Sequence, residues 1–421
     1  MKQLIVKILN LAVGGYLRRN KVLVVGVAGS VGKTSTVSAI RTVLSQKYRV
    51  HRPRTTYNTN KSVHLELFEL TFATSTFGWM RNVVKILWKS CGRAPYDLVV
   101  IELGTDHPGE LQTFAFLRPT LAVVTAVVPE HMEFFKTIDA VAAEELSITN
   151  FCGQVLVNAD MVEARFLQVM PQNVRYFGKH TDTYARGYAL DEAYHATADF
   201  HLKDNVMLRR QPVYVIGEHG LHALVAAAAV AGELGLKTEQ IADGLAAHQP
   251  VKGRMQLLRG LRDSLIIDDT YNASPEAMIE ALNVLYSAPA TQRIAVLGAM
   301  NEMGDYSKHA HQQVAEHCNP KKLAMVITVG KDANEFLAPV AQQKGCKVHT
   351  FTSPYAAGLF LKPLLTKQTV LLAKGSQNGV FTEETVKILL KSQADESKLV
   401  RQSAYWRAVK MRQFPTVGAA G

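Results

Sequence analysis

Cysteine is scarce in this sequence of 421 residues, and the few cysteines stand far apart. Cys91, Cys152, Cys318 and Cys346 form no Cys-x-x-Cys pair. Zinc ribbons and disulfide frameworks need paired cysteines at defined spacings, so neither is expected here. Isolated thiols of this kind suit the reducing environment of a cytoplasm.

A long apolar run is also lacking at the N-terminus. The apolar stretch of residues 4–13 is interrupted by Lys7 and Asn10, is too short to span a bilayer, and is followed by no small-residue cleavage pattern. We expect a short amphipathic helix without acidic residues. Its apolar face would carry Leu4, Ile5, Ile8, Leu11 and Ala12. The protein is expected to be cytoplasmic. The helix either packs against its own domain or contacts the inner surface of the membrane.

Acidic residues are fewer than basic ones. The 36 Asp and Glu stand against 47 Lys and Arg, which gives a formal net charge of +11 and a pI of about 9.3. This balance suits a nucleotide, a phospholipid surface or a nucleic acid as partner, or simply a solvated basic surface. No basic motif is interleaved with aromatic residues, so no nucleic-acid partner is expected. The apolar fraction of 48% can form the cores of two or three domains.

The segment GVAGSVGKTS, residues 26–35, almost fits the rule for a phosphate-binding loop. That rule asks for Gly, four free residues and Gly-Lys-Ser/Thr, but Val27 stands at the first glycine position. An apolar strand precedes the segment and a helical pattern follows it, so backbone amides and a helix N-terminus would face phosphate oxygens. The predicted nucleotide contacts are Gly29, Ser30, Val31, Gly32, Lys33, Thr34 and Ser35.

Polar residues at the ends of two further strands suggest a magnesium site. In the loop, Lys33 would pair with the β- and γ-phosphates and Thr34 would ligate Mg²⁺. Glu102 ends the strand in YDLVVIELGT, and His131 follows the strand in PTLAVVTAVVPEH. Because parallel strands end at the same edge of a sheet, we expect both residues near the loop. Either residue alone could instead be structural.

Apolar strands alternate with helical patterns in two successive stretches of the chain. This predicts an α/β fold, with a central P-loop ATPase domain containing a mostly parallel sheet and a C-terminal Rossmann-like α/β domain. We place the boundary near Pro250. The predicted divisions are an N-terminal amphipathic segment (1–20), a central ATP-binding domain (21–250), a C-terminal domain (251–396) and a basic C-terminal tail (397–421).

The loop and several later segments resemble the motifs of the Mur ligase family, the ATP-dependent amide-forming enzymes of peptidoglycan precursor synthesis. GVAGSVGKTS resembles the family's Gly-x-x-Gly-Thr-x-Gly-Lys-Thr loop, and TYNTNKSV, IELGTDHPGEL and VVPEHMEFF resemble the motifs after it. VKGRMQ, IIDDTYNASPEAM, VLGAMNEMG and LLAKGS match the later motifs in order. The resemblance spans roughly residues 22–390 and is strongest to members that add D-alanyl-D-alanine to a muramoyl tripeptide.

The resemblance implies a role for each matched residue in the first half of the chain. Lys33 holds phosphate, Thr34 and Glu102 bind one Mg²⁺, and His131 binds a second. A carboxylate is activated as an acyl phosphate, and cations stabilise the oxygens that crowd together. An acceptor amine then attacks the acyl phosphate, which forms an amide and releases phosphate.

In the second half of the chain the resemblance implies further contacts to ATP. Asp269 would bond the ribose, Asn272 would lie near adenine, and Arg254 and Lys374 would reach the phosphates when the C-terminal domain closes. The family's His-Asn pair after the nucleotide site appears here as His219 followed by glycine, and His219 is kept as a nucleotide contact. The family's N-terminal UDP-binding domain is expected to be absent, because only about twenty residues precede the first strand.

One catalytic lysine of the family has no counterpart. In the family, a lysine on the helix after the magnesium histidine is carbamylated and helps to bind the second metal ion. No lysine occurs here between Lys136 and Lys179, and the matching position, fourteen residues after His131, is Glu145. Glu145 would supply the carboxylate directly, with Glu144 as the alternative if the spacing differs by one. A solvated acidic turn is the remaining interpretation.

The function expected from the sequence is ATP- and Mg²⁺-dependent ligation of an amino acid or dipeptide, most closely D-alanyl-D-alanine, to a muropeptide-like carboxylate donor. One alternative is a Mur-ligase-like enzyme that acts on a lipid-linked or non-UDP acid. Another is a nucleotide-binding partner subunit without ligase activity. The last alternative is disfavoured because the matched residues are all present: Lys33, Thr34, Glu102, His131, Asp269 and Lys374.

Overall fold

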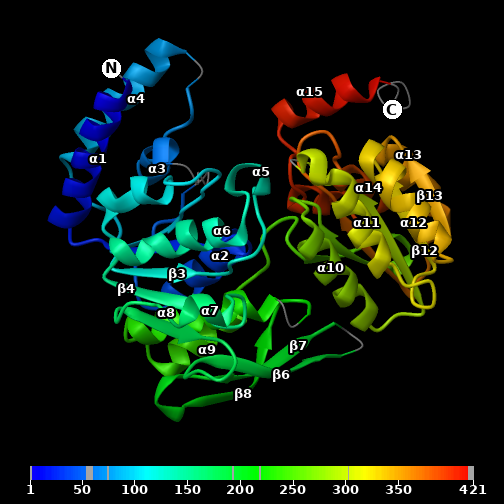
Figure 1. The fold of residues 1–421 in the computed structure, drawn as a ribbon, viewed down its shortest axis with the longest axis horizontal. Helices are drawn as coiled ribbons and strands as arrows, with labels where there is room; N and C mark the ends of the chain where they lie inside the picture. Colours follow the sequence, from blue (N-terminus) through cyan, green and yellow to red (C-terminus); the bar gives the residue numbers. More distant parts are fainter. Residues whose placement is uncertain are drawn as a thin grey trace. The chain divides into compact units, whose positions relative to one another are not determined.

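A computed structural model describes residues 2–53, 60–73, 75–191, 194–217, 220–301 and 303–415. The chain divides into two compact units. Unit 1 comprises Met1–Ala189, Ala196–Tyr214 and Leu221–Gln249, and unit 2 comprises Leu190–His195, Val215–Gly220 and Pro250–Gly421. Both units combine helices with a central sheet, as the ribbon in Figure 1 shows.

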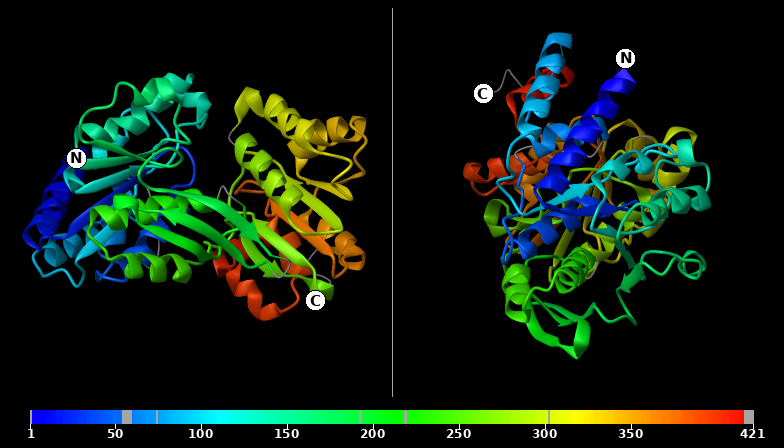
Figure 2. Two further views of the ribbon diagram at one scale, coloured as in Figure 1. Left: turned by 90° about the horizontal axis from the view of Figure 1, so that it is seen from below. Right: turned by 90° about the vertical axis from the view of Figure 1, so that its left-hand side faces the viewer.

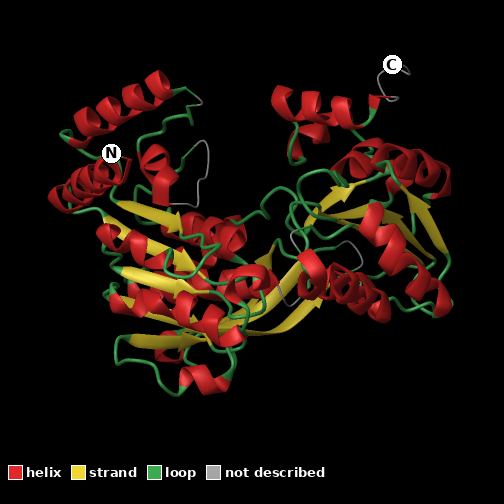
Figure 3. Cartoon of the chain, turned by 45° about the horizontal axis from the view of Figure 1, so that its top comes forward, coloured by secondary structure: helices red, strands yellow, loops and turns green. Residues whose placement is uncertain are grey.

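The central sheet of unit 1 is parallel and has the strand order β2-β1-β3-β4-β5. Its strands are β1 (Leu23–Ala28), β2 (Leu98–Glu102), β3 (Leu121–Val124), β4 (Gln154–Asn158) and β5 (Val174–Phe177). The inner strands β1 and β3 are apolar throughout because helices cover both faces of the sheet (Figure 3). The parallel α/β sheet expected for the first half of the chain is therefore confirmed.

Helices cover both faces of this sheet. One face carries α2 (Lys33–Leu44), α8 (Leu221–Glu233) and α9 (Thr238–Ala247). The other carries α1 (Lys2–Arg19), the 3-10 helix η1 (Leu111–Leu117) and α6 (Ile138–Leu146). Alternate strand residues turn to opposite faces, so Val24 and Val99 join the cluster that contains Val13 and Leu17 of α1.

Unit 1 also holds a second sheet that the sequence patterns did not predict. Its strand order is β6-β7-β8, from β6 (Tyr184–Leu190), β7 (Ala196–His201) and β8 (Met207–Val213). β7 and β8 are antiparallel, with a register shift between Ala198 and Phe200. The helix α9 packs against β8, which attaches this sheet to the helical layer of unit 1.

Unit 2 is built on a six-stranded sheet of order β13-β12-β11-β14-β10-β9. Only β9 (Gln256–Arg259) is antiparallel to its neighbour; the others are β10 (Leu265–Asp269), β11 (Gln292–Gly298), β12 (Met325–Val329), β13 (Val348–Phe351) and β14 (Thr369–Lys374). Separate apolar clusters cover its two faces. They include residues of α10 (Pro275–Ser287), α11 (Ser307–His317), α12 (Ala338–Gln343), α13 (Pro354–Leu361) and α14 (Glu383–Leu389).

The expected N-terminal helix forms, and the apolar face predicted for it is largely exposed. α1 buries Leu9, Val13, Tyr16 and Leu17, whereas Leu4, Ile8 and Leu11 are exposed. The reason is tertiary: α1 packs beside α4 (Thr76–Ser90) and α3 (Asn60–Leu67) and on η1, and these contacts decide which of its two apolar stripes is covered. Among the described residues, no helix is long and apolar enough to cross a membrane.

The basic C-terminal segment contains a helix that is held by buried ion pairs. In α15 (Ala404–Gln413), Lys410 is only 2% exposed, and its Nζ lies 2.8 Å from Glu383 and 2.5 Å from Glu384 of α14. Arg401 pairs with Glu383 at 2.8 Å. Both carboxylates are buried, so the basic residues of this segment compensate charges that would otherwise be unpaired.

We expect the Lys410→Ala substitution to lower the free energy of unfolding of unit 2 by about 3 kcal/mol, because removal of one partner leaves buried carboxylates without compensation. Urea unfolding followed by circular dichroism measures this. Lys391→Ala is the matched control, because the pair of Lys391 with Asp263 is exposed and should contribute little. Equal unfolding midpoints for the two variants would show that the buried network does not stabilise the helix.

Candidate active site

The loop between β1 and α2 has the geometry of a phosphate cradle. Gly29 and Gly32 adopt positive φ angles of 119° and 84°, which glycine adopts at little cost. A Cβ atom at Gly29 would lie 2.8 Å from the backbone nitrogen of Thr125, so no other residue fits there without a shift. Because α2 begins at Lys33, its free N-terminal amides face the loop.

Contacts from the end of β3 hold this loop in place. Thr125 Oγ1 donates to the carbonyl oxygen of Val31 at 2.6 Å, and Ser30 N donates to Ala126 O at 2.9 Å. Val128 N donates to Ser30 Oγ at 3.1 Å. The loop is therefore a preformed element, which reduces the ordering that nucleotide binding would otherwise require.

Lys33 is charged and faces the loop. Its Nζ donates to the carbonyl oxygens of Gly29 and Ser30 and lies 3.5 Å from Glu130 Oε2. Burial lowers the pKa of Lys33, but the carboxylates of Glu130, Glu145 and Glu102 more than offset this, so the pKa is raised above its usual value. The ammonium group stays protonated and can neutralise phosphate oxygens.

The predicted magnesium ligands Thr34 and Glu102 are in contact. Thr34 Oγ1 donates to Glu102 Oε2 at 3.0 Å, and Glu102 is buried at the end of β2. Within the described ranges, no three or more His, Cys, Asp and Glu side chains are grouped closely enough to hold a metal ion. Mg²⁺ is commonly held by one or two carboxylates together with phosphates and water, so this hydroxyl–carboxylate pair fits it.

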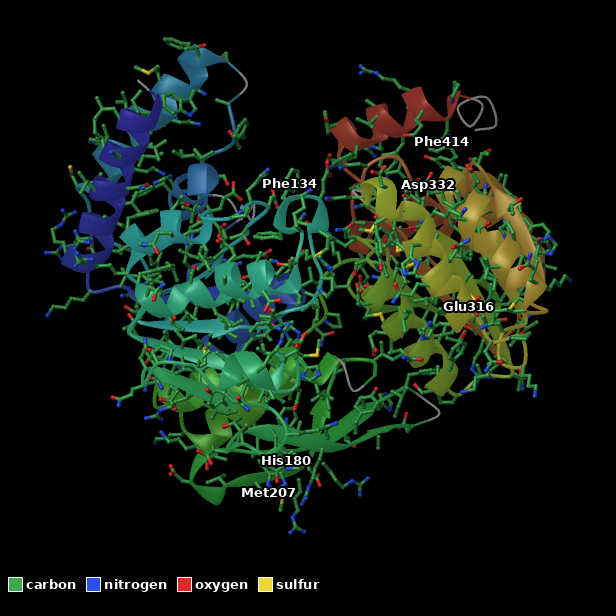
Figure 4. The ribbon with its side chains drawn as sticks, viewed as in Figure 1. Phe134, His180, Met207, Glu316, Asp332 and Phe414 are labelled. Carbon is green, nitrogen blue, oxygen red and sulfur yellow. The ribbon has the colours of Figure 1, made fainter. Side chains whose placement is uncertain are left out.

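His131 reaches the loop through Glu130, a residue that the sequence motifs did not single out. Its Nε2 lies 3.6 Å from Glu130 Oε1 and 3.4 Å from Asp106 Oδ1, while the other oxygen of Glu130 faces Lys33. His131 has a φ of 48° and immediately precedes the short helix α5 (Met132–Phe135). Phe134 of α5, labelled in Figure 4, packs on His107 with ring centroids 4.1 Å apart.

The two glutamates of α6 have different contacts. Glu145 Oε2 accepts a hydrogen bond from Gly29 N at 2.6 Å, and Thr105 Oγ1 donates to Glu145 Oε1 at 3.3 Å. Glu144 accepts from Gly109 N and Leu111 N at 2.6 and 2.7 Å. Both side chains are buried, so they do not form a solvated acidic turn. Burial raises the pKa of Glu145 to about 7, although Lys33 and these hydrogen bonds oppose the shift.

A second cluster of predicted residues forms within unit 2, where β10 and β14 end side by side. Lys374 Nζ lies 2.6 Å from Asp269 Oδ2 and donates to the carbonyl oxygen of Asn272 at 3.0 Å. Met255 N donates to Asp269 Oδ1 at 3.1 Å. Burial lowers the pKa of Lys374, Asp269 opposes this, and Arg254 lowers it further.

Arg254 belongs to the same cluster in unit 2. Its guanidinium carbon lies 4.2 Å from the ring centroid of Tyr271, and its buried Nε has no hydrogen-bond partner among the described residues. Such a donor is available to an anionic ligand. His219 lies outside the described residues, as do residues 56–59 of the matched segment TYNTNKSV.

A cavity of about 530 Å³ lies elsewhere in unit 1. Its lining includes Arg175, His180, Asp204 and Glu233 but none of the predicted site residues. His180 is labelled in Figure 4. Arg175 and Lys203 pair with Glu233 at 2.9 and 3.4 Å, so charges at this cavity compensate one another. The loop and strand-end cluster, with its charged lysine and adjacent carboxylates, is the stronger candidate for chemistry.

Models of known families cover most of the chain. The Mur ligase middle domain matches residues 27–231, and the Mur ligase glutamate ligase domain matches residues 253–377. The chain belongs to the Mur ligase family. The predicted family and the predicted enzyme class, an ATP-dependent ligase that forms carbon–nitrogen bonds with ATP and Mg²⁺, are confirmed.

Two individual relatives of this Mur ligase share the same name. The UDP-N-acetylmuramoyl-tripeptide--D-alanyl-D-alanine ligases of Synechocystis sp. and Bacillus subtilis are 28% and 27% identical over 372 and 385 residues. These matches cover 86% and 90% of the chain, and 74% and 78% of the relatives.

Solved structures of similar fold also match the Mur ligase chain. MurF from Acinetobacter baumannii has a TM-score of 0.72 at 24% identity. The match covers 91% of the present chain and 80% of the MurF chain. MurF ligase from Thermotoga maritima, solved in complex with ADP, has a TM-score of 0.71 at 22% identity. This match covers 93% of the present chain and 84% of the MurF chain. The predicted combination of α/β domains is confirmed by this shared fold.

Proposed function

We propose that this Mur ligase adds D-alanyl-D-alanine to the peptide carboxylate of a muramoyl tripeptide, in cell-wall precursor assembly. The observation that carries the proposal is the geometry at the loop. Lys33 donates to the loop carbonyl oxygens, and Thr34 donates to Glu102. This arrangement suits a phosphate group beside a cation. The names of the relatives support the choice of acceptor and donor.

The residues of unit 1 account for the first half of the reaction. The loop amides and the N-terminus of α2 bind the phosphates of ATP, and Lys33 neutralises charge that develops during transfer to the carboxylate. Thr34 and Glu102 would hold Mg²⁺, which supplies further charge neutralisation. The product of this step is an acyl phosphate, and attack by the amine of the acceptor forms the amide and releases phosphate.

Other predicted roles extend this proposal. We assign His131 and Glu145 to a second Mg²⁺, on the support that Glu130 links His131 to Lys33 and that Glu145 contacts the loop. In unit 2 we assign Asp269 to the ribose of ATP. The cluster of Asp269 with Lys374, Asn272 and Arg254 supports contacts to nucleotide there.

The second candidate differs only in the donor, which would be lipid-linked or another non-UDP acid. A surface of exposed apolar and basic residues on α1 and α4 favours it, because a lipid carrier resides in a membrane. A cytoplasmic location with a peripheral contact through the N-terminal segment belongs to the proposal as well.

Phosphate release with ATP and Mg²⁺ across a panel of donors and acceptors tests these assignments. We expect turnover with UDP-muramoyl tripeptide that requires D-alanyl-D-alanine, and none with single amino acids. Turnover only with a lipid-linked muropeptide would transfer the assignment to the second candidate. Nucleotide binding without turnover for any pair would instead indicate a partner subunit that does not ligate.

A further inference from the structure

The outer face of α4 carries large apolar side chains that the fold does not cover. Phe77 is 80% exposed and Trp88 is 76% exposed, with Met80 and Val84 exposed between them. The spacing of three, four and four residues places all four on one side of the helix. The opposite side, with Ile86, is buried against unit 1. Folding therefore does not account for the apolar side chains on the outer side.

The outer face of α1 repeats this pattern. Leu4, Ile8 and Leu11 are exposed at helical spacing. α1 and α4 lie side by side at one end of unit 1 and project in the same direction in Figure 1 and in the right-hand view of Figure 2. Their C-terminal ends are tied by Arg19 Nη2, which donates to Gly92 O at 3.2 Å just beyond α4.

The charges on these two helices are all of one sign. α1 and α4 together contain seven Lys and Arg and no Asp or Glu. Lys7 lies on the exposed side of α1, and Arg81 and Lys85 lie on the exposed side of α4, next to the apolar residues. Aromatic and aliphatic side chains flanked by basic ones are the pattern of helices that lie in the interface of an anionic bilayer.

We propose that α1 and α4 form a lipid-docking platform, whose apolar members are Leu4, Ile8, Leu11, Phe77, Met80, Val84 and Trp88. Its occupant is the surface of a bilayer that contains anionic phospholipid. The apolar side chains enter the boundary between headgroups and acyl chains, and the basic side chains contact lipid phosphates.

Charge distinguishes a lipid surface from a second copy of this chain. In a two-fold interface the same patch meets itself, so Lys7, Arg81 and Lys85 of one copy would face the same residues of the other, without an acidic residue on either helix. Such like-charge contacts oppose pairing. An anionic lipid surface compensates these three exposed charges, and the net charge of +11 adds long-range attraction.

Flotation of the full-length protein with vesicles tests the platform. We expect binding to vesicles of phosphatidylcholine with 30% phosphatidylglycerol, at least tenfold weaker binding to pure phosphatidylcholine, and a marked loss in 0.5 M salt. The double variant Phe77→Ser/Trp88→Ser and the double variant Lys7→Glu/Lys85→Glu should each bind at least tenfold more weakly.

The matched control is Tyr405→Ser/Met411→Ser on α15, which also exposes apolar side chains on a helix with basic and no acidic residues. This control should bind vesicles as the unchanged protein does.

In a Trp79→Phe/Trp406→Phe background, Trp88 emission should shift to the blue with anionic vesicles. All variants should retain nucleotide binding, because none of these residues belongs to the loop, so the lipid proposal and the ligase proposal can fail separately.

Three outcomes would overturn the proposal. The first is absence of flotation with anionic vesicles at low salt. The second is equal binding by the Phe77→Ser/Trp88→Ser variant and the α15 control. The third is a dimer in sedimentation analysis that this variant dissociates while vesicle binding is absent, which would make the surface an interface between copies.

Discussion

The Lys33→Ala variant should lose ATP-dependent ligation by a factor of about a thousand or more while keeping its fold. The ammonium group of Lys33 contacts loop carbonyl oxygens and a carboxylate, not the apolar core. In the proposed reaction its charge would serve bound phosphate, and donors aimed at the reacting groups contribute on the order of 10²–10³ each in rate. Phosphate release with saturating substrates measures the loss.

Lys47→Ala provides the control for Lys33. Lys47 Nζ also donates to two backbone carbonyl oxygens, those of Leu234 and Gly235, at 3.1 and 2.8 Å. Lys47 follows the C-terminal end of α2, whereas the loop lies at its N-terminal end. It should keep full activity. Circular dichroism and thermal unfolding of both variants separate a folding defect from a catalytic one. Full ligase activity of a folded Lys33→Ala protein would refute the nucleotide site.

The loop and the cluster in unit 2 could be predicted because short sequence segments determine them. Lys33 and Thr34 follow the loop glycines directly, and local spacing fixes where they point. Asp269 and Lys374 are the last residues of two strands, and these strands pair in parallel with the two residues in register. The rule that strand ends meet at one sheet edge was sufficient to bring them together.

Contacts that depend on tertiary packing could not be predicted in the same way. Glu130 was missed although it stands next to His131, because the left-handed backbone at His131 decides where both side chains point. The sequence left open whether the predicted apolar face of α1 packs on its own domain. Only the neighbouring elements show that the helix buries Leu9, Val13 and Leu17 and leaves Leu4, Ile8 and Leu11 exposed. The burial of Lys410 likewise depends on Glu383 and Glu384, which are distant in the sequence.

Glu145 is the site residue whose role most needs a direct test. Its carboxylate is buried, contacts the amide of Gly29, and lies close enough to Lys33 to affect its pKa. If it replaces the carbamylated lysine of the family, ligation should be independent of added bicarbonate. The Glu145→Ala variant should then turn over about a hundredfold more slowly and need more Mg²⁺, because loss of a group that holds or orients a metal costs about 10- to 100-fold.

The Glu145→Gln and Glu145→Lys variants separate charge from loop support. Glutamine can still accept the hydrogen bond from Gly29 but has no charge, so it should be as slow as alanine if the carboxylate binds Mg²⁺. Recovery of activity by glutamine would mean that Glu145 only anchors the loop. Glu145→Lys should be inactive unless bicarbonate restores a carboxylate.

Glu144→Ala is the matched control for these variants, because Glu144 is also buried on α6 but binds the amides of Gly109 and Leu111. Its loss should reduce thermal stability without raising the Mg²⁺ concentration needed for half-maximal rate. Initial rates across a Mg²⁺ series, with and without bicarbonate, compare all four proteins with the unchanged chain. A near-normal rate for Glu145→Ala would remove Glu145 from the metal site, since a ligand that contributes to binding the second cation cannot be deleted without cost.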